Sequence, residues 1–409
     1  MSKFQKYSRA CALAVLSASA AAAQPAHPAA LQPAHQHLNI LGNFKGANGA
    51  KPWSTLVLAS DGNFYGTTQN GGTNPLCTVS GGCGTIFKVT PSGKLTSLYS
   101  FAGTTDGGNT FAGLVQGANG NLYGVTPGEP PYTTNYGTAF EITLGGQFTI
   151  LHQFQGPEGA LPNGTLMLSS DGNFYGTAQE GGNGGGGTIF SMTPTGTLKT
   201  LWSFDYADFG FFPYSSLIQT KSGDLYGTTA GGTAYSLGGV FKLSAHGHFT
   251  VIHAFKGLYG GVDVSGLLLG ADGNFYGTTE NGGKYVGYGN VFKMTPTGKM
   301  TILHSFDVTD GDVPVGLLIQ GMDGNFYGTT AYGGPLDEGT VFKITPAGKL
   351  TTLYAFGGDT YKFGGNVYAG LVQAPNGLLY GDTFLGGSAV NPACPYGCGL
   401  VFSLSPGPN

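Results

Sequence analysis

Four aromatic residues and one acid are the side chains of this sequence best suited to holding a sugar: Trp53, Phe111, Tyr214, Tyr368 and Asp382. Aromatic rings can stack on the apolar face of a neutral sugar, and a carboxylate accepts hydrogen bonds from its hydroxyl groups. The sequence therefore predicts a ligand-binding site for a neutral glycan or a similar extracellular ligand. The alternative is that the rings only plug the mouth of a channel.

A second set of candidates is acidic. The segment DVTDGD contains Asp307, Asp310 and Asp312, and Asp337 and Glu338 follow in a later loop. Carboxylate oxygens of this kind bind calcium, so calcium is a candidate cofactor, although no motif requires one. A solvated acidic loop explains the same residues without a metal.

The sequence identifies no catalytic residue. It contains no Gly-x-Ser-x-Gly elbow, no His-Glu-x-x-His pair and no phosphate-binding loop. A glycan-cleaving hydrolase or lyase would use paired carboxylates, and no pair is identified by its spacing. Whether the protein is an enzyme stays open, and a structural or adhesive envelope protein is a third function class.

The chain repeats itself, and the repeat decides where these side chains lie. The segment DGNFYGTT begins at Asp61 and returns in close copies at Asp171, Asp272 and Asp323. A tyrosine–glycine pair marks seven units, at intervals of 50 to 58 residues. A period of this size predicts a propeller or a solenoid. The tyrosines are Tyr65, Tyr123, Tyr175, Tyr226, Tyr276, Tyr327 and Tyr380.

Each unit contains four short runs with the composition of β-strands, and no run has a helical period. Asp-Gly-Asn joins the first run to the second, and Thr-Pro-x-Gly joins the third to the fourth. Both are hairpin turns. The glycine after each tyrosine is expected to let a neighbouring sheet come close. We therefore expect four-stranded blades that pack face to face.

The seventh unit lacks a fourth strand after Gly399–Ser405. The missing strand is expected at the other end of the chain, because His37–Phe44 (HLNILGNF) matches Lys349–Phe356 (KLTTLYAF). Pairing of this first strand with the last blade would close the ring and remove its open edges. The sequence therefore predicts an all-β fold, a seven-bladed β-propeller over residues 37–409.

The unit GTVFKITPAGKLTTLYAF, Gly339–Phe356, resembles the repeat of the bacterial GloVer tandem-repeat proteins. The resemblance covers essentially the whole mature chain. It implies a repetitive, exported protein without an assigned chemistry. Members of this family often end in a cell-surface anchoring signal, whereas this sequence ends in SPGPN.

The first 23 residues have the features of a secretory signal peptide, because Lys3, Lys6 and Arg9 precede an apolar run and an alanine-rich end. The run is shorter than the ~20 residues of a membrane-spanning helix. We therefore expect a secreted or periplasmic protein without a transmembrane segment in its mature chain. Residues 24–36 are expected to form a flexible tether.

Four cysteines remain after removal of the signal. Export favours disulfides, and the spacing pairs Cys77 with Cys83 and Cys394 with Cys398. Zinc binding is the alternative, although neither spacing is the usual close Cys-x2-Cys knuckle.

The loops between the second and third strands, and those between units, lie on one face of the expected ring and carry most of the length variation. Such loops are the usual place for binding and catalysis. The mature chain has 21 acids, 14 lysines and no arginine, and fifteen acids and five lysines fall on this variable face. Nucleic acid and polyuronates are therefore disfavoured partners. We expect a monomer.

The third residue before the leucine of each innermost strand should surround the channel mouth on the variable face. Tyr368, Trp53 and Phe111 fall on blades seven, one and two, which closure makes neighbours. Asp382 replaces the threonine of Tyr-Gly-Thr on the same arc, and both cysteine loops belong there. The seven rim residues are Trp53, Phe111, Asn163, Tyr214, Val264, Pro314 and Tyr368.

Three histidines, His152, His253 and His304, suggest a metal triad at first. In the repeat they take the place of Tyr99 and its equivalents on the outermost strands of separate blades. They cannot converge on one metal, so we expect them to have packing roles.

Overall fold

The computed structural model describes residues 37–77, 79, 81–103, 105–128, 136–206, 210–232, 237–256, 261–285, 287–357, 364–388 and 394–407, with only the backbone of 261–264. The chain divides into Met1–Pro33 and Ala34–Asn409. The predicted signal peptide and tether lie outside the described residues. The described part contains β-strands and no α-helix, so it has no helix that could cross a membrane.

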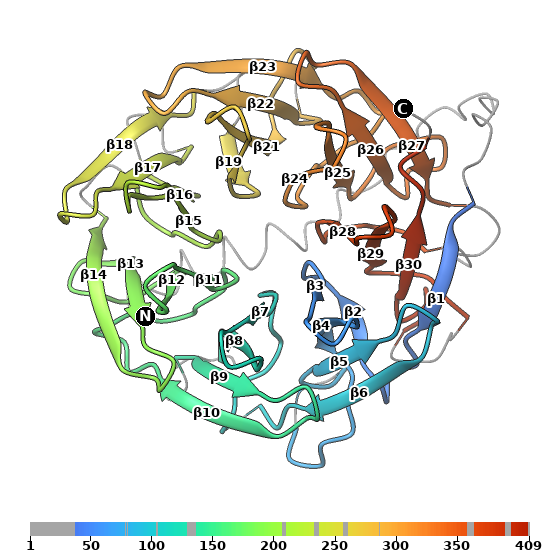
Figure 1. The fold of residues 1–409 in the computed structure, drawn as a ribbon, viewed down its shortest axis with the longest axis horizontal. Helices are drawn as coiled ribbons and strands as arrows, with labels where there is room; N and C mark the ends of the chain where they lie inside the picture. The colour runs from blue at the N-terminus through green and yellow to red at the C-terminus, as the bar shows by residue number, and fades with distance from the viewer. Residues whose placement is uncertain are drawn as a thin grey trace, which may run out of the picture. The chain divides into compact units, whose positions relative to one another are not determined.

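The strands form seven antiparallel sheets arranged in a ring, a seven-bladed β-propeller (Figure 1). The first, innermost strands of blades 1 to 7 are β3 (Val57–Leu58), β7 (Val115–Gln116), β11 (Met167–Leu168), β15 (Ile218–Gln219), β20 (Leu268–Leu269), β24 (Ile319–Gln320) and β28 (Val372–Gln373). The second strands are β4 (Phe64–Asn70), β8 (Leu122–Thr126), β12 (Phe174–Ala178), β16 (Leu225–Thr229), β21 (Phe275–Asn281), β25 (Phe326–Thr330) and β29 (Leu379–Thr383).

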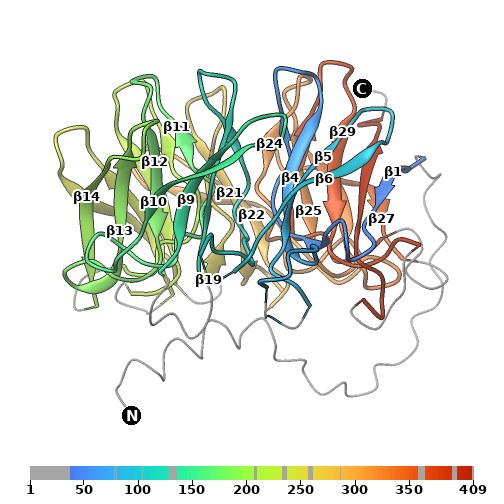
Figure 2. The ribbon, with the colours of Figure 1, turned by 90° about the horizontal axis from the view of Figure 1, so that it is seen from below.

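The third strands are β5 (Thr85–Val89), β9 (Thr138–Ile142), β13 (Gly185–Met192), β17 (Gly239–Leu243), β22 (Asn290–Met294), β26 (Thr340–Ile344) and β30 (Leu400–Leu404). The outermost strands are β6 (Leu95–Ser100), β10 (Phe148–Gln153), β14 (Leu198–Asp205), β18 (Phe249–Ala254), β23 (Met300–Ser305), β27 (Leu350–Ala355) and, for blade 7, β1 (Asn39–Asn43). Two extra short strands, β2 (Ala50–Pro52) and β19 (Gly261–Val264), pair with β4 and β21. Seen from the side, the short hairpins line one face of the ring and the longer connections line the other (Figure 2).

The N-terminal strand closes the ring, as the sequence predicted. Strand β1 pairs antiparallel with β30, with Asn39 opposite Ser403 and Asn43 opposite Leu400. The amide of Phe44 then donates to the Gly399 carbonyl at 3.0 Å. The buried Phe44 ring packs edge-on against Phe87 of blade 1.

Aromatic rings of the repeated Phe-Tyr-Gly segment hold neighbouring blades together. At four of the seven seams the tyrosine of one blade packs on the phenylalanine of the next, for example Tyr276 on Phe326 with ring centroids 4.0 Å apart. At the other three seams a leucine takes the place of the phenylalanine. The closing seam uses the same contact, because Tyr380 of blade 7 stacks on Phe64 of blade 1 at 4.1 Å. The residues that the repeat spells most faithfully are therefore used in inter-blade packing.

The aspartate of the repeated turn holds the same tyrosine from its polar end. Asp61 accepts hydrogen bonds from the Tyr65 hydroxyl at 2.8 Å and from Lys88 Nζ at 2.9 Å. Burial opposes ionisation of Asp61, but the hydrogen bonds from Lys88, Asn63 and Tyr65 outweigh it and keep the pKa well below its usual value. Comparable bonds recur at Asp272 and Asp323. The turn aspartates are therefore structural.

The glycine after each tyrosine makes room within its own blade, and not for a neighbouring sheet as expected. A Cβ built on Gly66 would lie 2.7 Å from the Phe87 ring and 3.0 Å from Leu56. Phe87 is the residue opposite Gly66 on β5. The phenylalanine of the third strand thus lies across the glycine, and any side chain there would displace the ring.

Closure by β1 predicts different outcomes for two N-terminal deletions. Removing residues 24–34 from the mature chain should leave the thermal midpoint nearly unchanged, because every described contact of blade 7 remains. Removing residues through Phe44 should expose the edge of β30 and cause aggregation. Differential scanning fluorimetry and light scattering measure both effects. Equal behaviour of the two truncations would contradict closure.

Candidate functional site

Three of the predicted rim aromatics meet on the variable face. Trp53 and Tyr368 are stacked in parallel, with centroids 4.1 Å apart and planes 5° apart. Phe111 meets Trp53 edge-on at 5.4 Å. All three side chains are partly exposed. The arc of blades 7, 1 and 2 predicted from the sequence therefore forms one aromatic cluster.

Two further aromatic residues belong to this cluster and were not predicted. Phe384 lies edge-on to Trp53 at 5.3 Å and to Tyr368 at 5.2 Å. The Tyr332 hydroxyl is 2.9 Å from the Tyr368 hydroxyl. Both follow a Tyr-Gly second strand, where Phe384 takes the place of Gln69 in blade 1. Aligning these positions, and not only the rim, would have found them.

The remaining rim is more polar. Tyr214 directly precedes blade 4 in the sequence, and blade 4 lies across the ring from blades 7 and 1 (Figure 1), so the structure does not bring Tyr214 to the other predicted rings. On blade 3, Asn163 Nδ2 donates to Gln179 Oε1 at 2.7 Å. In blade 6 the buried leucine before the innermost strand is Leu318, so Val315 takes the rim position that was assigned to Pro314.

Asp382 lies beneath the cluster and is not a surface anchor. Its side chain is buried, with the residue 1 % exposed, and neither carboxylate oxygen has a hydrogen-bond partner. Burial raises the pKa of this carboxyl well above its usual value. A ligand on the variable face would not touch Asp382 without displacing the rings above it.

Each of the two predicted disulfides is present and supports the segment that leads to one rim aromatic. Cys77 pairs with Cys83, and Cys394 pairs with Cys398. The Cys83 carbonyl accepts from the Asn109 amide at 2.8 Å, two residues before Phe111. The Cys398 carbonyl accepts from the Lys51 amide at 2.8 Å, two residues before Trp53.

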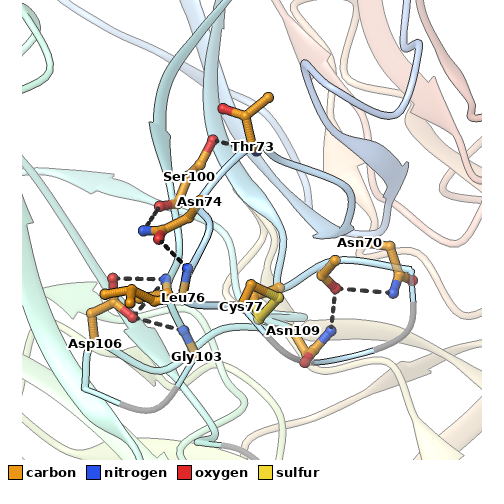
Figure 3. The surroundings of a disulfide bond; sticks show 12 residues. Asn70, Thr73, Asn74, Leu76, Cys77, Ser100, Gly103, Asp106 and Asn109 are labelled. Atoms are coloured by element: carbon orange, nitrogen blue, oxygen red, sulfur yellow. Dashed lines mark hydrogen bonds between the residues drawn. A yellow bond between two sulfur atoms is a disulfide. The ribbon is translucent and has the colours of Figure 1, made fainter.

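The anchored residues have a left-handed backbone, and this conformation is a feature of the repeat, because blades without a disulfide share it at Leu161, Phe212, Val313 and Asn366. Lys51 and Asn109 have φ values of 55° and 47°, in the left-handed region that non-glycine residues avoid. Asn109 is held further through its side chain, which donates to the Gln69 carbonyl and to the Gly82 carbonyl (Figure 3). Lys51 Nζ lies 5.3 Å from the centre of the Phe384 ring, so a cation flanks the aromatic cluster.

The outer-strand histidines contact nearby loops and backbone. His152 Nε2 lies 3.3 Å from Glu158, and His304 Nε2 lies 2.7 Å from Asp310. His253 Nδ1 lies 3.0 Å from the Gly298 carbonyl. These contacts lie on three different blades, as the repeat predicted.

The acids predicted to bind calcium have separate partners within the protein and do not converge on one point. Asp310 contacts His304 and accepts from the Asp307 amide at 3.0 Å, while Asp337 accepts from the Gly333 amide. Burial, together with the charge of Asp337, raises the pKa of Asp312 to about 6. Among the described residues, no group of three or more His, Cys, Asp or Glu side chains is placed to hold a metal.

The face opposite the aromatic cluster carries an apolar groove at the same seam between blades 7 and 1. Leu58, Pro91 and Pro375 are among the residues that line it. At four other seams a glutamine in the position of Leu58 bonds the preceding blade, as Gln373 does with the Met322 amide at 2.8 Å. Blades 3 and 5 have a leucine there, as blade 1 does. Leucine in place of glutamine at residue 58 leaves this seam without that bond.

Comparison with known proteins agrees with the repeat. The Gloeobacter/Verrucomicrobia repeat matches residues 29–220, 77–285 and 210–402. The chain belongs to this repeat family. The resemblance found in the sequence is thus confirmed across the propeller. No curated protein matches the sequence.

Solved structures support the fold. Virginiamycin B lyase from Staphylococcus aureus superposes with a TM-score of 0.56 at 12 % identity, over 88 % of this chain and 98 % of that one. A gluconolactonase from Xanthomonas campestris gives 0.46 at 11 % identity, over 94 % and 99 %. A putative 6-phosphogluconolactonase from Bacteroides uniformis gives 0.47 at 16 % identity, over 74 % and 85 %. At 12 % identity, the likeness to virginiamycin B lyase concerns the fold alone.

Removing one disulfide should increase the solvent access of Trp53 while lowering the stability of the propeller only slightly. Changing Cys394 and Cys398 to serine opens a loop with a sequence separation of 4, and closing so short a loop contributes about 2 kcal/mol at most. In a Trp202→Phe background Trp53 is the only tryptophan. Its acrylamide quenching should rise while the thermal midpoint falls by only a few degrees. Unchanged quenching would show that the loop does not position Trp53.

Proposed function

We propose that this protein is an exported ligand-binding propeller that recognises a neutral carbohydrate, or a ligand with a similar flat apolar face, at its aromatic cluster. The cluster consists of Trp53, Phe111, Tyr332, Tyr368 and Phe384. The observation that carries the proposal is the gathering of these partly exposed rings from four consecutive blades, 6, 7, 1 and 2, at one mouth of the ring.

The chemistry of the surrounding groups suits a neutral, hydroxylated ligand. Stacking on rings supplies affinity, and a few polar groups supply orientation. The Tyr332 and Tyr368 hydroxyls lie together at the edge of the cluster, and the Asn163–Gln179 pair lies on blade 3 of the same rim. A sugar lying over Trp53 could present its hydroxyl groups to such partners.

The charge of the variable face argues against polyanionic ligands. The acids on this face outnumber the lysines, and the mature chain has no arginine. Repulsion would oppose the approach of nucleic acids or polyuronates. Lys51 stands beside the cluster, where its ammonium group could donate a hydrogen bond to a sugar hydroxyl or to a single carboxylate but could not offset the surrounding acids.

The proposed location is secreted or periplasmic, which the two disulfides support. We expect the protein to act as a monomer and to require no cofactor. Glycan cleavage and a structural or adhesive role in the envelope are the alternatives, and the same experiment separates them.

A glycan array with the purified chain, followed by mass spectrometry of the incubated glycans, tests the proposal. Binding without cleavage supports a binding module, and bond cleavage identifies an enzyme. The absence of both binding and cleavage favours a structural role. For a glycan that binds, Trp53→Ala should weaken the affinity about fivefold or more, because one ring stack contributes on the order of 1 kcal/mol.

Trp202→Ala is the matched control. Trp202 also stacks on an aromatic ring, Phe249 at 4.8 Å, but it lies on the outer strand β14 of blade 3. Its removal should leave the affinity unchanged. A large fall in the melting temperature of Trp53→Ala without a change in affinity would identify the cluster as a packed plug of the channel.

A further inference from the structure

The position of Asp382 has a defined partner in other blades. Where Asp382 stands, most repeats have a threonine whose hydroxyl donates to a backbone carbonyl of the next blade. These bonds are Thr67 to Ala112 at 2.9 Å, Thr177 to Ser215 at 3.0 Å, Thr278 to Pro314 at 2.7 Å and Thr329 to Ala369 at 2.7 Å. They are hydrogen bonds across the seams between blades.

The acceptor in blade 1 is identified by the same repeat. Three of these four acceptors, Ala112, Ser215 and Ala369, directly follow a rim residue: Phe111, Tyr214 and Tyr368. The fourth, Pro314, directly precedes one, Val315. The residue that follows Trp53 is Ser54. The Ser54 carbonyl is therefore the counterpart of the carbonyls that accept from threonine at other seams.

The side chain of Asp382 faces blade 1. Alternate residues of a strand point to the same side, and Tyr380 and Phe384, two residues before and two after, both contact blade 1. Tyr380 stacks on Phe64 at 4.1 Å, and Phe384 lies against Trp53 at 5.3 Å. Asp382 is therefore enclosed in the seam directly below the aromatic cluster.

Only one protonation state of Asp382 fits this place. An ionised carboxylate can only accept hydrogen bonds, whereas the protonated acid has one O–H to donate. Neither oxygen of Asp382 accepts a bond, and an unpaired buried charge is costly. A neutral acid facing a carbonyl can do what threonine does elsewhere.

Few charged groups surround this position. Strands β28 and β30, which flank β29, contain no ionisable residue. Strand β29 itself contributes Tyr380, and the preceding rim contributes Tyr368. Strand β2, which packs against β29, contributes Lys51, whose ammonium group lies over the Phe384 ring. Burial alone accounts for the raised pKa of Asp382.

We propose that Asp382 is a positioning residue that, as a neutral acid, donates its proton to the Ser54 carbonyl and so fixes Trp53 in the aromatic cluster. This role rests on the proposed function, because it treats Trp53 as a ligand-binding residue. Ionisation removes the donated bond and places a charge in the seam. The cluster is therefore ordered at acidic pH and loosens as the pH rises.

The sign of the pH effect follows from proton binding. The folded protein holds the Asp382 proton more tightly than the unfolded chain, in which an aspartate ionises near pH 4. The stabilisation is complete below that pH and is lost as the pH rises through the raised pKa of the folded state. In this window the melting temperature should fall by about 2 °C per pH unit relative to a variant that cannot ionise.

Asp382→Asn tests the proposal, because its amide donates a hydrogen bond at every pH. In the Trp202→Phe background, acrylamide quenching of Trp53 and the melting temperature are measured from pH 4 to pH 9. With aspartate at 382, quenching should rise and the melting temperature should fall relative to Asp382→Asn as the pH increases. Asp382→Thr introduces the threonine found at this position in most repeats and should behave like Asp382→Asn. It replaces Asp382→Asn in the experiment if the asparagine variant does not fold.

Asp323→Asn is the matched control in the same background. Hydrogen bonds outweigh burial and lower the pKa of Asp323, so this substitution should change the pH dependence only in the acid range and with the opposite sign. Parallel pH profiles for the parent and Asp382→Asn, in both quenching and melting, would overturn the proposal. No ligand is used, so failure here is distinct from failure of the glycan-binding test.

Discussion

The ring depends on a repeated tyrosine, which in blades 1, 3, 5 and 6 is held at both ends. Its ring packs against the next blade, as in the 4.0 Å stack of Tyr276 on Phe326, and its hydroxyl is bound by the aspartate of its own turn. The apolar contact fixes the distance between blades, and the hydrogen bond fixes the direction of the ring. Because the ring must close, an error in one seam would be passed to the others. This explains why the segment around Tyr-Gly recurs with so little variation within the chain.

The closing seam between blades 7 and 1 uses that contact but departs from the repeat around it. Tyr380 still stacks on Phe64. Around this pair, however, Asp382 replaces threonine, and Phe384 stands where blade 1 has Gln69. The disulfide loop of Cys394 and Cys398 then joins this seam to the Trp53 segment. The aspartate that replaces threonine thus lies at the seam where the ring carries its aromatic cluster.

The arrangement separates stability from recognition. The hairpin face and the blade interfaces are built from repeated residues, so they support the ring without depending on the variable loops. The variable face can then carry strained residues such as Lys51 and Asn109, because rigid strands and backbone hydrogen bonds to the preceding blade hold them. A binding site on such a face gains from preorganisation, since less ordering is left to occur when a ligand arrives.

Much of the fold was determined by the sequence alone. The period of the Tyr-Gly pairs fixed the number of blades, the match of His37–Phe44 to Lys349–Phe356 fixed the closure, and cysteine spacing fixed both disulfides, because each depends on local or repeated patterns. The convergence of Trp53, Phe111 and Tyr368 followed from that closure. Only the tertiary structure decided that Phe384 joins them and that Asp382 is buried beneath them, because burial depends on which side chains of the facing blade cover a position.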